Sequence, residues 1–144
     1  MGKINYRRVL LGGLLAGVII NVVEFVLNGL VFREDWAAAL AALGKSQPTS
    51  AGLTALMTTW GFLVGVTAVW LYAAVRPRFG PGPKTALYAG LATWLLAYLS
   101  AGLAGVPLEL FPGSLMATVT AAGMVEAVAA TMAGAWVYRE EATT

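Results

Sequence analysis

The fold is decided by one stretch near the start of the chain, residues 9–32, which reads VLLGGLLAGVIINVVEFVLNGLVF and holds a single charged residue, Glu24. A helix that crosses about 30 Å of hydrocarbon needs about 20 predominantly apolar residues. This stretch has 24 residues, so it is long enough to cross. It therefore predicts a membrane-spanning helix.

Three further gaps between charged residues are of the same kind: residues 46–75, 85–108, and 110–138, in which only Glu126 is charged. Trimmed at their Pro and Gly residues, the four stretches predict helices near residues 8–32, 52–75, 84–105 and 114–138. We predict an all-α membrane protein, a four-transmembrane-helix bundle, in which residues 1–144 form one integral membrane domain.

Two breaks separate the later helices. The segment 77–83, PRFGPGP, is expected to end the second helix because Pro cannot continue one, and Pro107 and Pro112 bracket the next break. Between the first two helices, residues 33–43 repeat apolar side chains at helical spacing and are followed by Gly44, a residue type that favours helix ends. This pattern predicts a short interfacial amphipathic helix at about 34–43. A loop over residues 44–50 then leads into the second span.

The composition excludes whole classes of function. Of 144 residues, 59% are hydrophobic and only 11% are charged, and the mean hydropathy is +0.77. A soluble domain usually carries about a quarter of its residues as charge. The absence of His and Cys excludes a Ser-His-Asp triad, a thiolate or imidazole zinc site, His-ligated haem and disulfides. We expect no cofactor, no metal and no enzymatic activity.

The basic residues predict the orientation of the chain. They form no continuous patch of the kind that binds nucleic acid, so we expect a lipid bilayer and no nucleic acid as partner. With four spans, Arg33 and Lys45 fall on one side and seven basic residues on the other: Lys3, Arg7, Arg8, Arg76, Arg78, Lys84 and Arg139. Cytoplasmic loops retain positive charge. We therefore predict a multi-pass protein of a bacterial-type cytoplasmic (inner) membrane with both termini cytoplasmic.

Glu24 is the most informative residue of the first span. A carboxyl group inside an apolar membrane helix costs on the order of 3 kcal/mol and normally faces a partner or a cavity. Asn21 and Asn28 lie on the same helical face, and Gly13 and Gly17 extend this face toward the N-terminus. Two interpretations stay open. The face lines a path for a solute or for protons, or its small and amide side chains join helices.

Glu126 is the second acidic residue inside a predicted span, and it lies at the middle of the helix expected at 114–138. Glu24 lies about four residues, or roughly 6 Å, beyond the midpoint of the first helix, so the two can lie at similar depth. If the first and last helices pack together, the two carboxyl groups would share a proton. Otherwise Glu126 needs another partner, and the sequence offers the hydroxyl groups of Thr58, Thr59, Thr67, Thr93, Thr118 and Thr120.

Three aromatic residues lie away from the membrane interfaces, where Trp is favoured. Trp60 and Trp94 fall near the middle of their spans, and Tyr98 follows Trp94 by one helical turn. An aromatic wall opposite a carboxylate is an arrangement that binds hydrophobic cations. The same residues also serve as core packing when their polar tips find a carbonyl oxygen.

Two Gly-x-x-x-Gly motifs, at Gly13 and Gly17 and at Gly61 and Gly65, are typical of close helix association. Four short helices enclose little interior, so we expect these faces to serve self-association. The sequence thus predicts a homo-oligomer, a dimer or trimer rather than a monomer.

The opening of the chain resembles that of a family of small bacterial four-span membrane proteins of uncharacterised activity. The residues that carry the likeness are Ile4-Asn5-Tyr6, Phe32-x-x-x-Trp36 and Leu43-Gly44, within about the first 45 residues. The resemblance implies four spans and no particular activity.

A second resemblance is to small multidrug transporters, which have four spans, an essential Glu in the first helix and a Trp on the third. Glu24 and Trp94 are the matching positions. This chain departs from that pattern in its greater length, its surface helix, its second acidic residue at Glu126 and its strong charge bias. The resemblance implies proton-linked transport of a cation.

Three classes of function are therefore open. The first is a non-catalytic accessory or assembly protein whose polar groups only specify helix packing. The second is a proton-linked transporter or pore for a small hydrophobic or cationic solute, with Glu24 and Glu126 as carriers. The third is an intramembrane enzyme that acts on a lipid or quinone, although no phosphate-binding Arg cluster or metal-ligand spacing is present. We take transport as the testable prediction, and the site candidates are Glu24, Glu126, Asn21, Asn28, Trp94, Tyr98 and Trp60.

Overall fold

The computed structural model describes residues 3–47 and 50–140, and this part of the chain contains helices and no strands. Four helical runs are long and apolar enough to cross a membrane: Tyr6–Val31, Ala51–Phe79, Pro83–Leu108 and Gly113–Val137. The predicted all-helical class and the four long helices are thus confirmed. Each run begins one or two residues before the predicted bound; the first and last runs end one residue earlier than predicted, and the second and third end up to four residues later.

Local sequence explains where the helices begin. The first run consists of α1 (Tyr6–Val26) and the π-helical segment η1 (Leu27–Val31), and the side chain of Asn5 caps it by accepting a hydrogen bond from the Arg8 N–H at 3.0 Å. Ser50 caps α3 (Ala51–Phe79) in the same way. The third run is composed of α4 (Pro83–Trp94), the π-helical η2 (Leu95–Leu99), α5 (Ser100–Gly105) and the 3₁₀ helix η3 (Val106–Leu108), and α6 (Gly113–Val137) follows.

The short helix between the first two spans is α2 (Arg33–Ala42). Its end confirms the predicted role of Gly44, which has φ +68° and donates its N–H to the carbonyl oxygen of Ala41 at 2.9 Å. A left-handed glycine in this place satisfies carbonyl groups that the helix leaves free. Of the loop predicted over 44–50, residues 48 and 49 lie outside the described residues.

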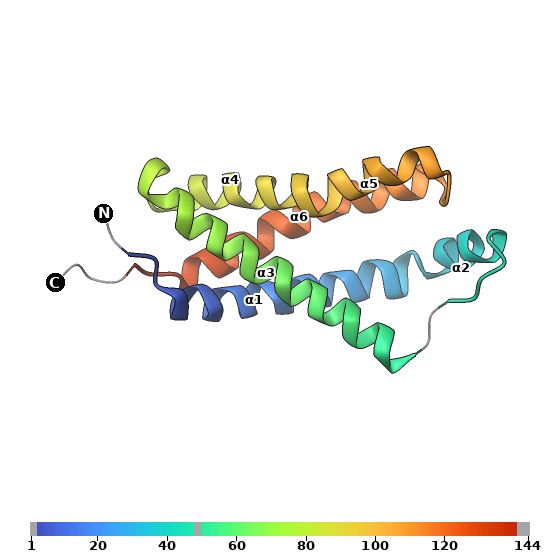
Figure 1. The fold of residues 1–144 in the computed structure, drawn as a ribbon, viewed down its shortest axis with the longest axis horizontal. Coiled ribbons are helices and arrows are strands. Elements are labelled where there is room, and N and C mark those ends of the chain that lie inside the picture. Colours follow the sequence, from blue (N-terminus) through green and yellow to red (C-terminus); the bar gives the residue numbers. More distant parts are fainter. Residues whose placement is uncertain (1–2, 48–49, 141–144) are drawn as a thin grey trace.

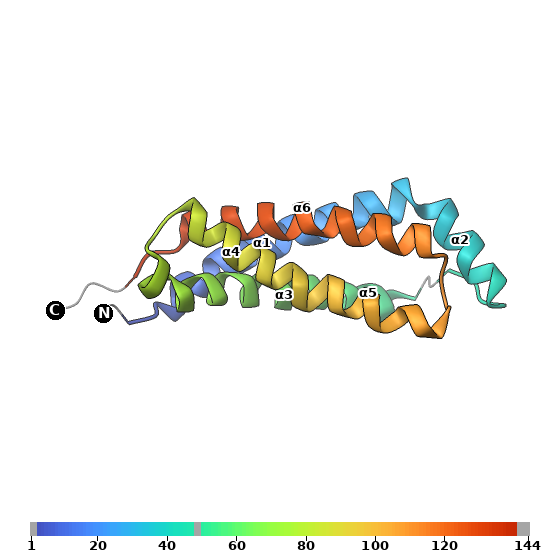
Figure 2. The same ribbon diagram turned by 90° about the horizontal axis from the view of Figure 1, so that it is seen from above.

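Both ends of the chain and the α3–α4 link lie at one end of an elongated bundle, and α2 lies at the other (Figures 1 and 2). Helix α1 packs against α3 and α6, and α6 packs against α4. Helix α3 crosses the others obliquely, so its beginning diverges from the bundle (Figure 1). As a result, all of residues 51–60 are exposed.

The prediction that Pro77 ends the second helix is wrong. Helix α3 continues through Pro77 to Phe79 and ends at Gly80, which has φ +83° and donates its N–H to the Arg76 carbonyl oxygen at 2.8 Å. Pro77 lies in the last turn of α3, so the one backbone hydrogen bond that it removes affects few further residues of the helix. Likewise Pro107 lies inside η3, and that run ends at Leu108, followed by Glu109 with φ +48°.

The two Gly-x-x-x-Gly motifs face each other within one chain. A Cβ atom on Gly65 of α3 would lie 2.7 Å from the Gly17 Cα and the Gly13 carbonyl oxygen of α1. Small residues permit this close backbone approach. The α1–α3 contact within one chain therefore occupies both of these faces, and self-association of the chain stays a prediction.

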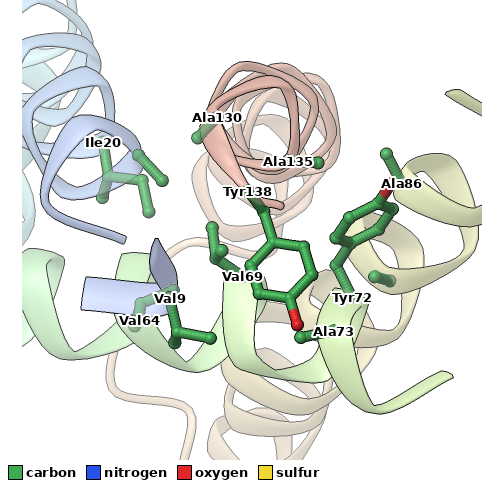
Figure 3. Close-up of a cluster of buried hydrophobic side chains, with 12 residues drawn as sticks. Val9, Ile20, Val64, Val69, Tyr72, Ala73, Ala86, Ala130, Ala135 and Tyr138 are labelled. Atoms are coloured by element: carbon green, nitrogen blue, oxygen red, sulfur yellow. The ribbon is translucent and has the colours of Figure 1, made fainter. Parts of the chain in front are cut away.

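The buried apolar cluster lies toward the end of the bundle that holds the termini, and Figure 3 shows it. It consists of small and β-branched side chains with two tyrosines, from α1, α3, α4, the second half of α6 and the residue that follows α6. Its members are Val9, Ala16, Ile20, Val64, Val69, Tyr72, Ala73, Ala86, Ala89, Ala130, Ala135 and Tyr138.

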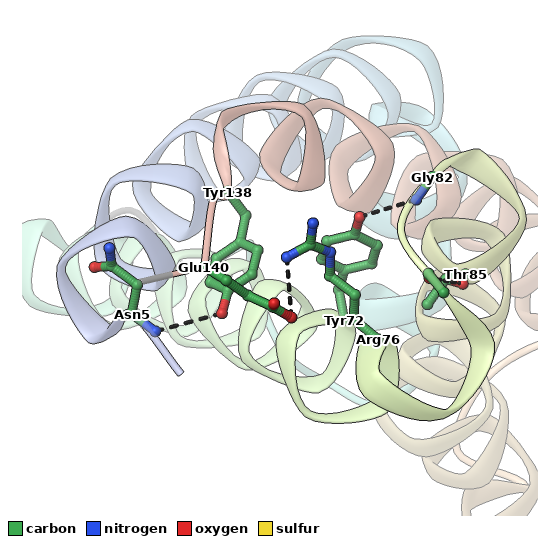
Figure 4. A network of polar contacts seen from close by, with 8 residues as sticks. Asn5, Tyr72, Arg76, Gly82, Thr85, Tyr138 and Glu140 are labelled. Atoms are coloured by element: carbon green, nitrogen blue, oxygen red, sulfur yellow. Dashed lines mark hydrogen bonds and ion pairs between the residues drawn. The ribbon is translucent and has the colours of Figure 1, made fainter. Parts of the chain in front are cut away.

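Polar contacts fasten the same end (Figure 4). The Asn5 N–H donates to the Tyr138 hydroxyl oxygen at 3.3 Å, and the Gly82 N–H donates to the Tyr72 hydroxyl oxygen at 3.2 Å. Arg76 forms an ion pair with Glu140 at 3.0 Å. These contacts tie the residue before α1, the residues just after α6 and the α3–α4 link to the core.

Candidate functional site

A cavity of about 270 Å³ lies in the opposite half of the bundle, between the α1–η1 run, α2, the η2–α5 run and α6. Both intramembrane carboxyl groups line it. Among the described residues, no Lys or Arg lines this cavity. Its polar and aromatic lining residues are Glu24, Asn28, Phe32, Trp36, Tyr98, Thr120 and Glu126.

A chain of hydrogen bonds holds Glu24. The Trp36 indole N–H donates to Oδ1 of Asn28 at 2.9 Å, and Nδ2 of Asn28 donates to Oε2 of Glu24 at 2.5 Å. The chain begins on α2 and ends on α1, so the short helix is coupled to the carboxyl group. Nitrogen donors to a carboxyl oxygen at such distances make strong hydrogen bonds.

Glu126 enters the cavity from α6, and only 4% of its surface is exposed. The Tyr98 hydroxyl group donates to its Oε1 at 3.4 Å, which is long for a hydrogen bond between oxygens. The ring of Trp60 meets that of Tyr98 edge-on, at 5.6 Å between centroids. Glu126 is thus held more loosely than Glu24. Its hydrogen-bond donor, Tyr98, is itself supported by Trp60 of α3.

Both π-helical segments border the cavity. Segment η1 supplies Leu27 and Asn28, and η2 supplies Ala97 and Tyr98. A π-helical turn inserts one extra residue and so changes the direction of the side chains that follow, which is why such turns are frequent at functional sites. No residue pattern in the sequence indicated these two segments.

The structure brings together four of the seven predicted site residues, namely Glu24, Asn28, Tyr98 and Glu126. Trp60 supports the Tyr98 ring without lining the cavity. The Trp94 N–H donates to the Thr120 carbonyl oxygen at 2.8 Å, and its ring borders a neighbouring groove.

Asn21 belongs to helix packing instead. Its amide donates to the carbonyl oxygens of Gly17 at 2.8 Å and Thr58 at 3.2 Å, so it joins α1 to α3. The single helical face proposed from the sequence therefore divides. Its Gly13–Asn21 part faces α3, and its Glu24–Asn28 part faces the cavity.

Sequence reasoning missed two residues that shape the site. Trp36 was assigned to a surface helix, although its indole reaches Asn28. Gly123 of α6 makes room for Tyr98, because a Cβ atom on it would lie 2.5 Å from the Tyr98 Cδ1. The signal in the sequence that could have identified Gly123 is its spacing, three residues before Glu126.

Comparison of the chain with protein-family models, with curated proteins and with solved structures finds no match in any of the three. The resemblances to small bacterial four-span proteins and to small multidrug transporters therefore stay predictions. Within residues 3–47 and 50–140, no group of three or more acidic residues could hold a metal ion. The class that the structure defines is an all-helical chain with four helices long and apolar enough to span a membrane.

Proposed function

We propose that this chain is a four-span protein of a bacterial-type inner membrane that exchanges protons for a small hydrophobic or organic cation in the cavity between Glu24 and Glu126. The observation that carries the proposal is that both intramembrane carboxyl groups, from the first and last spans, line one cavity. Intramembrane carboxyl groups turned toward a cavity mark ion and proton paths.

The chemistry of the lining suits a cation. Two carboxyl groups without a basic neighbour among the described lining residues attract positive charge, and the rings of Trp36 and Tyr98 add cation–π attraction. Each carboxyl group accepts a side-chain hydrogen bond through one oxygen, at Oε2 of Glu24 and Oε1 of Glu126. The remaining oxygens have no side-chain donor among the described residues, so they are available to a ligand or a proton.

The same proposal orients the chain. The seven basic residues expected on the cytoplasmic side belong to the beginnings of α1 and α4, the end of α3 and the segment after α6, which all lie at the end that holds both termini (Figure 1). The positive-inside rule places this end in the cytoplasm. Helix α2 then lies at the outer surface, and its Trp36 lines the cavity from that side.

A second candidate is a non-catalytic accessory protein, and the α1–α3 contact favours it. Gly13, Gly17 and Gly65 permit close approach, and Asn21 bridges the two helices. In this interpretation Asn28 and Tyr98 serve only to satisfy the hydrogen-bonding needs of the partly buried Glu24 and the buried Glu126.

Measurement of proton flux distinguishes the proposed proton–cation exchanger from the accessory protein. The parent protein is reconstituted into proteoliposomes that enclose a pH-sensitive dye, and a gradient of tetramethylammonium is applied. We expect proton movement with the parent and with Glu34→Gln, the control variant, which removes an exposed carboxyl group outside the cavity. We expect none with Glu24→Gln or Glu126→Gln, because an amide cannot exchange the proton. Equal flux in all four would contradict the proposal, and no flux in any would favour the accessory role.

A further inference from the structure

Helix α2 is attached to the rest of the bundle at few points. Among the described elements, its only extensive contact is with η1, the π-helical segment that precedes it. The contact that reaches across to the other side of the bundle is made by Trp36, whose ring meets that of Phe111 edge-on at 5.3 Å between centroids. Phe111 belongs to the link between η3 and α6. One aromatic pair therefore fastens the short helix to that link.

An open groove of about 750 Å³, which we call the α2 groove, lies between α2 and the same link. One face of α2 lines it, with Asp35, Ala38, Ala39 and Ala42 at helical spacing. Packed helices in a protein interior leave few such spaces. The alanines on this face leave the groove largely unfilled, so α2 has room to shift relative to α6.

The backbone departs from a regular helix at both ends of α2. Phe32, just before it, has φ −97° and ψ 16°, and Gly44, just after it, has φ +68°. Hinges are commonly a few residues at the ends of elements. The side-chain amide of Gln47 donates to the carbonyl oxygen of Arg33 at 2.7 Å, which ties the segment after α2 to the start of the helix. The helix and this segment can thus move as one unit.

We propose that α2 is a lid on the cavity described above, hinged at both of its ends and latched by the pair of Trp36 and Phe111. With the latch closed, Trp36 lines the cavity and donates to Asn28, which in turn donates to Glu24. With the latch released, the indole leaves and the cavity opens at the end of the bundle that holds α2 (Figure 1). The inference concerns access to the cavity, whatever the cavity binds.

The reaction rate of a single cysteine inside the cavity tests the lid. Val119→Cys is the reporter, because Val119 lines the cavity but not the α2 groove, and the chain has no native Cys. In lipid nanodiscs, the probe is 2-(trimethylammonium)ethyl methanethiosulfonate, a charged reagent that lipid excludes. Phe111→Ala removes the partner of Trp36 and changes no residue that lines the cavity. We expect it to raise the rate by about two- to tenfold, the shift in open population that loss of one edge-on aromatic pair gives.

Two control variants are made in the same reporter background. Phe111→Tyr keeps the ring that Trp36 contacts, so its rate should equal that of the parent. Phe79→Ala breaks the edge-on pair of Phe79 and Tyr88, 5.6 Å between centroids, which joins the end of α3 to α4, and it should also leave the rate unchanged. A parent-like rate in Phe111→Ala, or an equal rise in Phe79→Ala, overturns the latch.

A distance measurement follows the movement of α2 itself. Spin labels are attached at Ala41→Cys on α2 and at Lys84→Cys on α4, two exposed positions that line neither the cavity nor the α2 groove. By pulsed electron double resonance, we expect a second distance that becomes more populated in Phe111→Ala than in the parent. The same distance distribution in both proteins overturns the lid. The proposed function is tested separately, because neither of these measurements uses proton flux.

Discussion

Glu24 and Glu126 lie on the first and last spans and yet line the same cavity, each with a different neutral donor beside it. The amide of Asn28 holds Glu24 closely, and the hydroxyl group of Tyr98 holds Glu126 at a longer distance. Under the proposed function, this asymmetry predicts that Glu126 adjusts more readily than Glu24 to a ligand or a proton.

Gly123→Ala should displace Tyr98 from Glu126. The new Cβ atom would meet the Tyr98 ring, and such overpacking costs about 1–3 kcal/mol. We expect a lower free energy of unfolding, measured by titration with sodium dodecyl sulfate, together with weaker tetramethylammonium binding. Gly113→Ala is the control on the same helix, because a Cβ atom there meets nothing within 4 Å. Parent-like binding by Gly123→Ala would show that Tyr98 does not position Glu126.

Trp36→Phe should uncouple α2 from Glu24. Phe keeps an aromatic ring at this position but lacks the indole N–H, so the hydrogen bond to Asn28 is lost. An average intramembrane hydrogen bond is worth about 0.6 kcal/mol. We expect faster amide hydrogen exchange across α2 than in the parent. Trp70→Phe serves as the control, since Trp70 is 44% exposed. Identical exchange in α2 for both variants would contradict the coupling.

Gly65→Ala should push α1 and α3 apart. The added methyl group would lie 2.7 Å from the Gly17 Cα, so we expect a loss of about 1–3 kcal/mol in the free energy of unfolding. Gly52→Ala on the same helix meets nothing within 4 Å and should not lower stability, since Ala favours helix more than Gly does. A result in which both variants match the parent would rule out the close α1–α3 contact.

Tyr138 should make stability fall in alkaline solution. Burial raises its pKa above the ordinary value of about 10, so the folded state holds the phenolic proton more tightly than the unfolded state. This contribution is complete below about pH 10 and is lost as the pH rises beyond it. Tyr138→Phe should show a shallower alkaline loss than the parent, with exposed Tyr6→Phe as the control. A parent-like slope in Tyr138→Phe would contradict this role.

Single cysteines test the orientation, because the chain has no native Cys. We expect Lys45→Cys to react with an impermeant maleimide added outside intact cells, and Pro81→Cys to react only after the membrane is opened. Lys45 follows α2 and Pro81 lies in the α3–α4 link, and these two parts of the chain are at opposite ends of the bundle (Figure 1). The reverse labelling pattern would invert the proposed topology.

The long helices were predictable because hydrocarbon thickness imposes a minimum length on any apolar span, and the gaps between charges show it directly. Counting residues along the spans also predicted that Glu24 and Glu126 can lie at similar depth, and the two residues line one cavity. Which helices pack against each other was not predictable from the sequence, because every face of an apolar helix is suited to contact with lipid. The π-helical segments at 27–31 and 95–99 also left no signal, and they determine how Asn28 and Tyr98 enter the cavity.

The two halves of the bundle differ in how firmly their atoms are held. The buried cluster occupies the half near the termini, whereas the cavity, the α2 groove and the diverging start of α3 occupy the other. Low local contact density lowers the free energy of local opening. The half that holds the cavity can therefore widen or narrow while the half near the termini keeps the helices together, so the molecule has a fixed pivot and a compliant end, which the proposed orientation places away from the cytoplasm.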